Sequence, residues 1–201
     1  MDILILATLV VIAFGVLKAH DQRRRVVLLG SQLRQYQIEK LMENLTEGYL
    51  RGLGEQDADR RAQIWGLLAG TEEALNGQFQ RFVVDFAKLD AADTRVSTLP
   101  FAVPFADKLF PSATFDLRQA FAIHARGMAE VAQNQQQRSP RDKAFTMSAE
   151  LFLMQHSCHW FCRSRAVASA RLLARHKTSY AQVLDAVSPG TRQAYSSLVG
   201  R

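Results

Sequence analysis

The most apolar stretch of the chain lies at its beginning. Residues 3–17 include no charged side chain, and four basic residues follow closely: Lys18, Arg23, Arg24 and Arg25. As a helix, residues 3–17 would extend about 22 Å, somewhat less than the ~30 Å hydrocarbon core of a bilayer. The pattern predicts a single transmembrane anchor, with residues 3–17 in the bilayer and residues 1–25 forming the anchor and its basic stop.

Two other interpretations of this segment stay open. A cleaved signal peptide has an apolar region of similar length, but it usually begins with a positive charge, and Asp2 stands in that place. A cut before His20 would also place the bulky Leu17 where a small residue is usual. The second alternative is an interfacial or buried helix. Because Lys and Arg beside a span tend to stay in the cytoplasm, we expect a single-pass protein of the cell membrane, with its N-terminus outside and residues 26–201 as a cytoplasmic helical domain.

Apolar positions continue at helical spacing after the arginines, but the face that they occupy changes. Positions 26, 29, 33 and 36 form one stripe, and positions 38 to 53 form another on nearly the opposite side. The first stripe is consistent with a helix at the lipid headgroups, where Arg23 to Arg25 and Arg34 would reach phosphates. It is equally consistent with an ordinary bend at Gly30 or near Gln37.

The next two segments predict a long antiparallel helical hairpin. Residues 52–54, Gly-Leu-Gly, end the first helix, and Asp57 can cap the second. From Ala58 to about Leu89 the apolar residues fall on one face, which predicts a helix of roughly thirty residues. The short glycine turn between the two helices is typical of an αα-hairpin.

Residues 90–113 form a proline-rich connection that is too apolar to lie loose in water. Pro104 can begin a short helix inside it, because proline suits the first helical position. Three aromatic residues of this connection either close the end of the bundle or form a docking surface for a partner or the bilayer: Phe101, Phe105 and Phe110.

The second half of the chain is also helical in pattern. Thr114 should open a helix in which His124 lies in the middle of an apolar stripe. Ser139 and Pro140 then provide a helix start. From Pro140 to about Arg175 we expect one central helix, which is apolar nearly all round in its middle and is therefore buried.

Two short helices should finish the chain. The first begins at the capping box formed by Ser179 and Gln182, and the second begins at Ser188-Pro189. No strand-like alternation of useful length is present. The predicted fold class is therefore all-α: an N-terminal single-pass anchor followed by a bundle of about five to six helices. We expect the core to include Phe79, Phe82, Phe86, Leu117, Phe121, Leu151 and Phe152.

The net charge of +6 is concentrated at the two ends of the chain. From Leu151 onward there are seven Lys or Arg and one acidic residue, Asp185. A basic end beside an anchor suits anionic lipid headgroups better than nucleic acid, although a solvated helix face explains the C-terminal part as well. Nucleic-acid binding is not expected, because the arginines spread around their helix and form no single stripe.

One cluster has side chains that could carry chemistry. Cys158 and Cys162 are one helical turn apart with His159 beside them, and His124 could join them from the neighbouring helix. These four residues are candidate ligands for a metal or haem, but they lack the paired spacing of a strong zinc motif. Buried Cys and His are more often structural, so we expect a structural role and no cofactor.

No catalytic motif accompanies this cluster, and we expect the protein not to be an enzyme. Two functions are consistent with the sequence. The first is a membrane-tethered helical domain that binds a protein partner at the cytoplasmic face. The second is a ligand-binding or sensory bundle that holds a metal, haem or small apolar molecule near His124 and Cys158.

Overall fold

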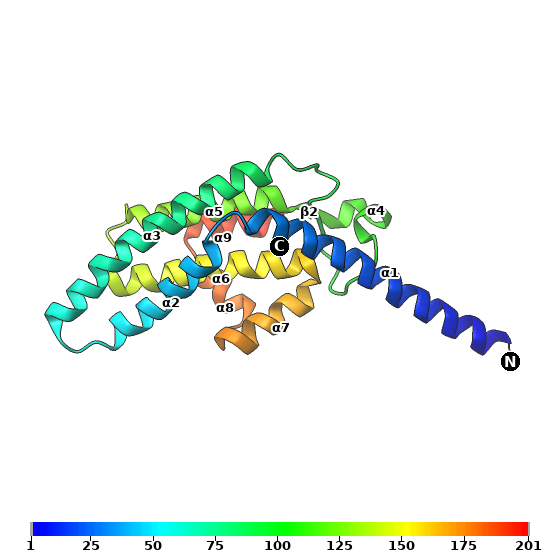
Figure 1. Cartoon of the computed structure of the whole chain (residues 1–201), viewed down its shortest axis with the longest axis horizontal. Helices are drawn as coiled ribbons and strands as arrows, with labels where there is room; N and C mark the ends of the chain where they lie inside the picture. Colours follow the sequence, from blue (N-terminus) through cyan, green and yellow to red (C-terminus); the bar gives the residue numbers. More distant parts are fainter. Residues whose placement is uncertain (1, 201) are drawn as a thin grey trace.

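The computed structural model describes residues 2–200, and most of these residues are helical (Figure 1). Met1 of the predicted anchor segment 1–25 and Arg201 of the predicted domain 26–201 lie outside this range. Within it the elements follow in the order α1 (Asp2–Leu33), α2 (Ile38–Gly54), α3 (Ala58–Phe86), β1 (Arg95–Ser97), α4 (Ala106–Leu109), a 3-10 turn η1 (Pro111–Ala113), β2 (Thr114–Asp116), α5 (Leu117–Gln133), α6 (Pro140–Cys162), α7 (Arg165–His176), α8 (Tyr180–Ala186) and α9 (Pro189–Leu198). The predicted all-α class is confirmed.

Helix α1 is one unbroken helix with two different environments. Its N-terminal half projects from the domain, and residues 3–17 are exposed (Figure 1). Its C-terminal half packs against α6 and α3, where Asp21 and Leu29 are buried. The chain then turns at residues 34–37, so the change of stripe arises from a bend near Gln37. Tyr36 fixes this bend by donating a hydrogen bond from its hydroxyl to Asp85 at 2.5 Å.

Helices α2 and α3 form the predicted antiparallel hairpin. Asp57 caps α3 by accepting a hydrogen bond from the backbone N–H of Arg60 at 2.8 Å, as expected. The two helices approach closely at Gly48, where a Cβ atom would stand 2.3 Å from a methyl group of Leu68. A side chain at position 48 would therefore force the Leu68 side chain to move.

The core is built around aromatic rings from α3 and α5. Phe121 packs edge-on against Phe79, Phe82 and Phe86, with ring centroids 4.9 to 6.1 Å apart. All four rings are buried, as are Leu117 and Leu151. The predicted core is thus confirmed at these positions. Phe152 differs, because it is half-buried and stacks on the imidazole of His176 with centroids 3.8 Å apart.

The connection between α3 and α5 contains strand structure that the sequence pattern did not predict. Strands β1 and β2 pair antiparallel, with Val96 opposite Phe115. The expectation that Thr114 opens a helix was wrong: Thr114 belongs to β2, and α5 begins after Asp116, whose carboxylate accepts from the backbone N–H of Arg118. The short helix expected at Pro104 begins instead at Ala106.

Helix α6 lies at the centre of the bundle, with α5 and α9 on one side and α7 and α8 on the other (Figure 1). Its burial confirms it as the central element, but the expectation of one helix to about Arg175 was wrong. The helix ends at Cys162, and Ser164 caps α7 by accepting from the N–H of Val167 at 3.3 Å. The capping box of Ser179 and Gln182 is confirmed at α8.

Candidate functional site

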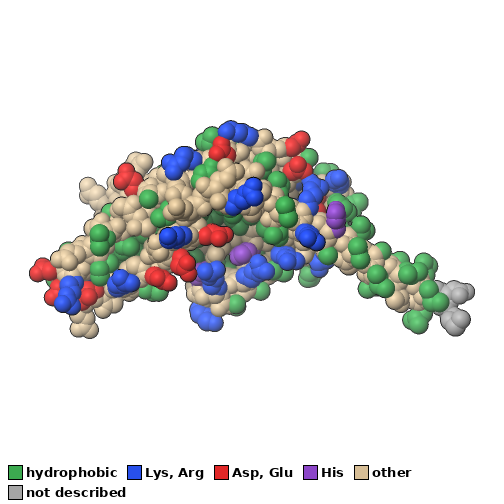
Figure 2. Space-filling model, in the orientation of Figure 1, with side chains coloured by type: hydrophobic (Ala, Val, Ile, Leu, Met, Phe, Trp, Pro, Cys, Tyr) green, Lys and Arg blue, Asp and Glu red, His purple; other side chains and the backbone are tan. Residues whose placement is uncertain are grey.

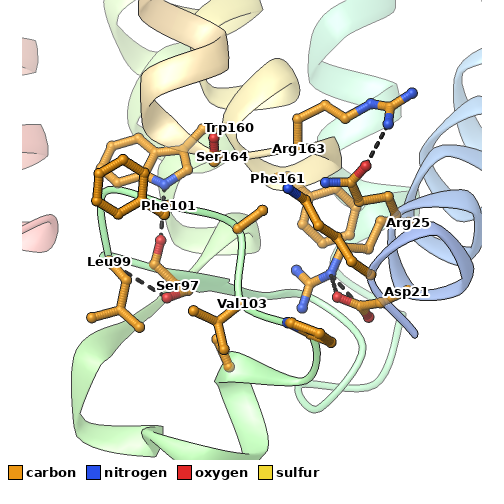
Figure 3. Close-up of a pocket in the computed structure, with 15 residues that line it drawn as sticks. Asp21, Arg25, Ser97, Leu99, Phe101, Val103, Trp160, Phe161, Arg163 and Ser164 are labelled. Atoms are coloured by element: carbon orange, nitrogen blue, oxygen red, sulfur yellow. Dashed lines mark hydrogen bonds and ion pairs between the residues drawn. The ribbon is translucent and has the colours of Figure 1, made fainter. Parts of the chain in front are cut away.

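The point where α1 leaves the domain carries a small cavity of about 30 Å³ (Figure 3). Its walls come from α1, from residues 97–106 and from the junction of α6 and α7. Figure 3 shows Trp160 donating its indole N–H to the backbone carbonyl of Ser97, a bond of 2.8 Å that ties the connection to α6. The cavity marks the joint between the apolar helix and the bundle.

Two of the four basic residues predicted to flank the membrane hold this joint together. The guanidinium of Arg25 contacts Asp21, Asp107 and the backbone carbonyl of Arg95, and it lies 5.2 Å from the ring centroid of Phe161. The neighbouring Arg24 forms an ion pair with Asp93. These two side chains are therefore engaged with the protein.

The remaining two basic residues of this group, Lys18 and Arg23, form no ion pair within residues 2–200. Arg23 is exposed and Lys18 is half-exposed on α1. They stand at the position expected for contact with anionic headgroups.

The proline-rich connection presents apolar side chains to solvent near this joint. Phe101 is 74% exposed, Leu109 is 63% exposed and Phe110 is 48% exposed, whereas Phe105 is half-buried. Phe101 and Phe110 therefore do not close the end of the bundle. Helix α4 lies beside α1 where that helix emerges (Figure 1), and Arg25 of α1 forms an ion pair with Asp107 of α4.

His124 lies against the central helix, as the apolar stripe predicted. It is completely buried, and its Nε2 atom is 2.9 Å from the hydroxyl of Ser157, which in turn is 2.9 Å from the hydroxyl of Tyr195. Burial lowers the pKa of His124 to about 3, with a smaller contribution from His156. The hydroxyl network holds Nε2 of the neutral imidazole, whereas the buried Nδ1 atom has no hydrogen-bond partner among residues 2–200.

The other three candidate ligands point elsewhere. Cys158 contacts the thioether of Met154 at 3.7 Å, and His159 accepts a hydrogen bond from Arg171 at 3.2 Å. Burial raises the pKa of Cys158, and it raises the pKa of Cys162 to about 11. Across residues 2–200 no three His, Cys, Asp or Glu side chains are placed to hold a metal ion. The four candidate residues are not brought together as a ligand set.

A larger, mostly apolar groove that sequence reasoning missed lies between α2, α6 and α8. It encloses about 500 Å³, and its residues include Leu50 and Leu53 on α2 and Phe145 on α6. These three side chains are 73%, 37% and 53% exposed, respectively. Arg175 and His176 of α7 form its polar edge. The sequence did contain a signal for this groove, because Leu50 and Phe145 are large apolar residues at helix positions outside the buried stripes.

Comparison with known proteins places this chain in no group. No protein-family model, curated protein or solved structure matches the sequence or the fold significantly.

Proposed function

We propose that this protein is a membrane-tethered, non-enzymatic domain that binds an amphipathic helix of a partner protein at the cytoplasmic face of the cell membrane. The observation that carries the proposal is the groove between α2, α6 and α8, which leaves large apolar side chains in solvent on a domain attached to an apolar helix. Exposed apolar surface of this kind typically marks an interaction site.

The shape and charge of the groove favour a helical partner. Leu50 and Leu53 are three residues apart on one face of α2, and Phe145 of α6 lines the same groove, so the groove offers apolar contacts from two helices. Arg175 at its edge favours acidic residues on the polar side of the partner. The partner expected is therefore an amphipathic helix with an acidic flank.

The membrane tether is the second part of the proposal. Helix α1 is the element of residues 2–200 that is long and apolar enough to cross a bilayer, and the candidate span is not buried in the domain. Its basic residues all lie after the apolar run, which favours an external N-terminus and a cytoplasmic domain. Lys18 and Arg23 supply contacts for anionic headgroups, and Phe101, Leu109 and Phe110 supply apolar contacts at the bilayer surface.

Site-specific photo-crosslinking in native membranes tests the groove. A photoreactive amino acid at position 50 or 145 of the full chain should give the same discrete adduct with one partner. The same group at Val84, which is 62% exposed on α3, should not give it. A Leu50→Asp substitution should abolish the adduct formed from position 145.

Two results would contradict the groove proposal. One is an equal yield of adducts from positions 84 and 145, and the other is an adduct of exactly two copies of this chain. The tether has its own test: a reporter fused after Arg201 should be active in the cytoplasm. A soluble secreted form beginning near His20 would instead support a cleaved signal peptide.

A further inference from the structure

A second cavity lies between α6 and α7, shares Arg175 with the groove, and has two arginines and two histidines in its lining. It encloses about 450 Å³, and its polar lining consists of Gln155, His156, His159, Arg171 and Arg175. No carboxylate belongs to this lining. Figure 2 shows Lys and Arg side chains gathered over and beside α7 and continuing toward the base of α1.

The positive charge in this cavity has no acidic counterpart. Neither Arg171 nor Arg175 takes part in an ion pair within residues 2–200, and both are exposed. Arg171 donates instead to the Nδ1 atom of His159, which must therefore be unprotonated at that atom. Glu39 of α2, whose negative charge reaches Cys158, is not part of the lining. Two guanidinium groups thus face a space with no protein anion.

A buried hydrogen-bonding group faces the same cavity. His156 is 1% exposed, and its Nε2 atom lies 3.1 Å from the hydroxyl of Ser169. Its Nδ1 atom is buried and has no hydrogen-bond partner. When Ser169 donates to Nε2, the proton of the neutral ring resides on Nδ1. The second imidazole of the lining, His159, accepts from Arg171 at Nδ1, so the proton of its neutral ring resides on Nε2.

We propose that this cavity binds a phosphate group. A phosphate offers three or more acceptor oxygens, which match the guanidinium forks of Arg171 and Arg175 together with an imidazole donor. A carboxylate has two oxygens and would satisfy fewer of these donors. The phosphate is either the headgroup of an anionic phospholipid or a free phosphate, because both present the same chemistry.

The pKa of His159 should respond to a bound phosphate. The pKa of His159 is lowered by burial and then by the charges of Arg171, Arg175 and His176. A bound dianion would offset those charges, so it should raise the pKa of His159. The binding event therefore has a spectroscopic signature that is independent of any activity.

Titration of the full chain with inorganic phosphate in uncharged detergent micelles tests the site. The imidazole NMR signals of His159 and His156 should shift saturably, and Arg171→Gln should weaken the affinity by about tenfold or more, as expected for the loss of a charged hydrogen bond. Arg126→Gln is the matched control, because Arg126 is exposed on α5 and makes no hydrogen bond or ion pair with the rest of residues 2–200. The control should bind phosphate with unchanged affinity.

Nanodiscs distinguish the two sources of the phosphate. If the ligand is a lipid, discs of phosphatidylcholine with phosphatidic acid should produce the His159 shift that discs of phosphatidylcholine alone do not. If the ligand is free phosphate, added phosphate should produce the shift equally in both kinds of disc. A shift that never saturates, or that is equal in Arg171→Gln and Arg126→Gln, would overturn the proposal. Arg171 does not line the helix-binding groove, so Arg171→Gln should leave the photo-crosslink from position 145 unchanged.

Discussion

The guanidinium of Arg25 on α1 donates a hydrogen bond to the carboxylate of Asp107 on α4, with an Nη2–Oδ1 distance of 2.9 Å. Both side chains are largely buried, at 14% and 11% exposed. This pair connects the helix that carries the apolar N-terminal segment to the connection that carries the exposed Phe101, Leu109 and Phe110. Part of the basic cluster after the apolar run therefore holds α1 against the rest of the protein.

Arg25→Gln should loosen α1 from the domain. The substitution leaves Asp21 and Asp107 without a cation, so we expect a loss of about 1.5–3 kcal/mol in the free energy of unfolding. Urea denaturation of the full chain in micelles measures this loss. Arg23→Gln is the control, because Arg23 is exposed and makes no ion pair. Equal stability of the two variants would show that the Arg25 contacts add nothing.

Two truncations should behave differently. Removal of residues 1–17 leaves Asp21, Arg25 and Leu29 in place, and we expect a soluble, fully folded domain. Removal of residues 1–25 deletes the ion pairs with Asp107 and Asp93, so that fragment should unfold at a lower temperature. Thermal melting compares the two. Identical melting temperatures would mean that residues 18–25 do not belong to the folded unit.

Phe82→Ala should be strongly destabilising. Phe82 is 1% exposed and packs against Phe79, Phe86 and Phe121, so its removal should cost about 3–5 kcal/mol through lost burial and an unfilled cavity. Val84→Ala, two residues away on the exposed face of α3, should cost less than about 0.5 kcal/mol. Urea denaturation gives both values, and a similar midpoint for the two variants would contradict the assigned core face.

His124 should make stability depend on pH in a defined direction. Because burial lowers its pKa to about 3 from an ordinary 6.5, the unfolded chain binds the proton first, and this contribution to stability is lost as the pH falls from about 6.5 toward 3. In that pH range the free energy of unfolding should change with pH less steeply in His124→Gln, by about 1.4 kcal/mol per pH unit. Glu150 acts in the opposite direction, since burial raises its pKa, but it is present in both proteins. Equal slopes in wild type and variant would show that the pKa of His124 is the same in the folded and unfolded chain.

The two cysteines should react slowly in the folded protein. Burial raises the pKa of Cys162 to about 11 and that of Cys158 further, so little thiolate is present at pH 8. Alkylation by iodoacetamide should be about a hundredfold slower than for an ordinary thiol. Full reactivity should return in denaturant. Protection that vanishes after treatment with a chelator would instead indicate a bound metal.

The parts of the fold that could be predicted are those set by local sequence. Asp57, Ser139 and Ser179 each cap a helix as expected, because a side-chain oxygen beside free backbone N–H groups suffices. The break at Ser164 was missed, since no Gly or Pro interrupts the apolar pattern there. Strands of three residues, such as Arg95–Ser97, are too short to show a period of two.

The candidate sites were harder to predict because they depend on tertiary packing. His124 was placed correctly against the central helix, but Cys158 and His159 take partners that no spacing rule specifies. Leu50 and Phe145 come from separate helices, and their common groove exists only after α2 packs beside α6. The same holds for Arg171 and His156. They line one cavity from either side of the break between α6 and α7, which the sequence pattern did not show.

Because α1 is continuous, the rotation of the domain about the helix axis is fixed relative to residues 3–17. The helix is continuous from its exposed apolar turns to the buried Leu29, with no linker between them. Each residue added between Leu17 and Asp21 would turn the whole bundle by roughly 100° about the helix axis. The side of the domain that faces a given direction relative to residues 3–17 is therefore set by the number of residues between Leu17 and Asp21.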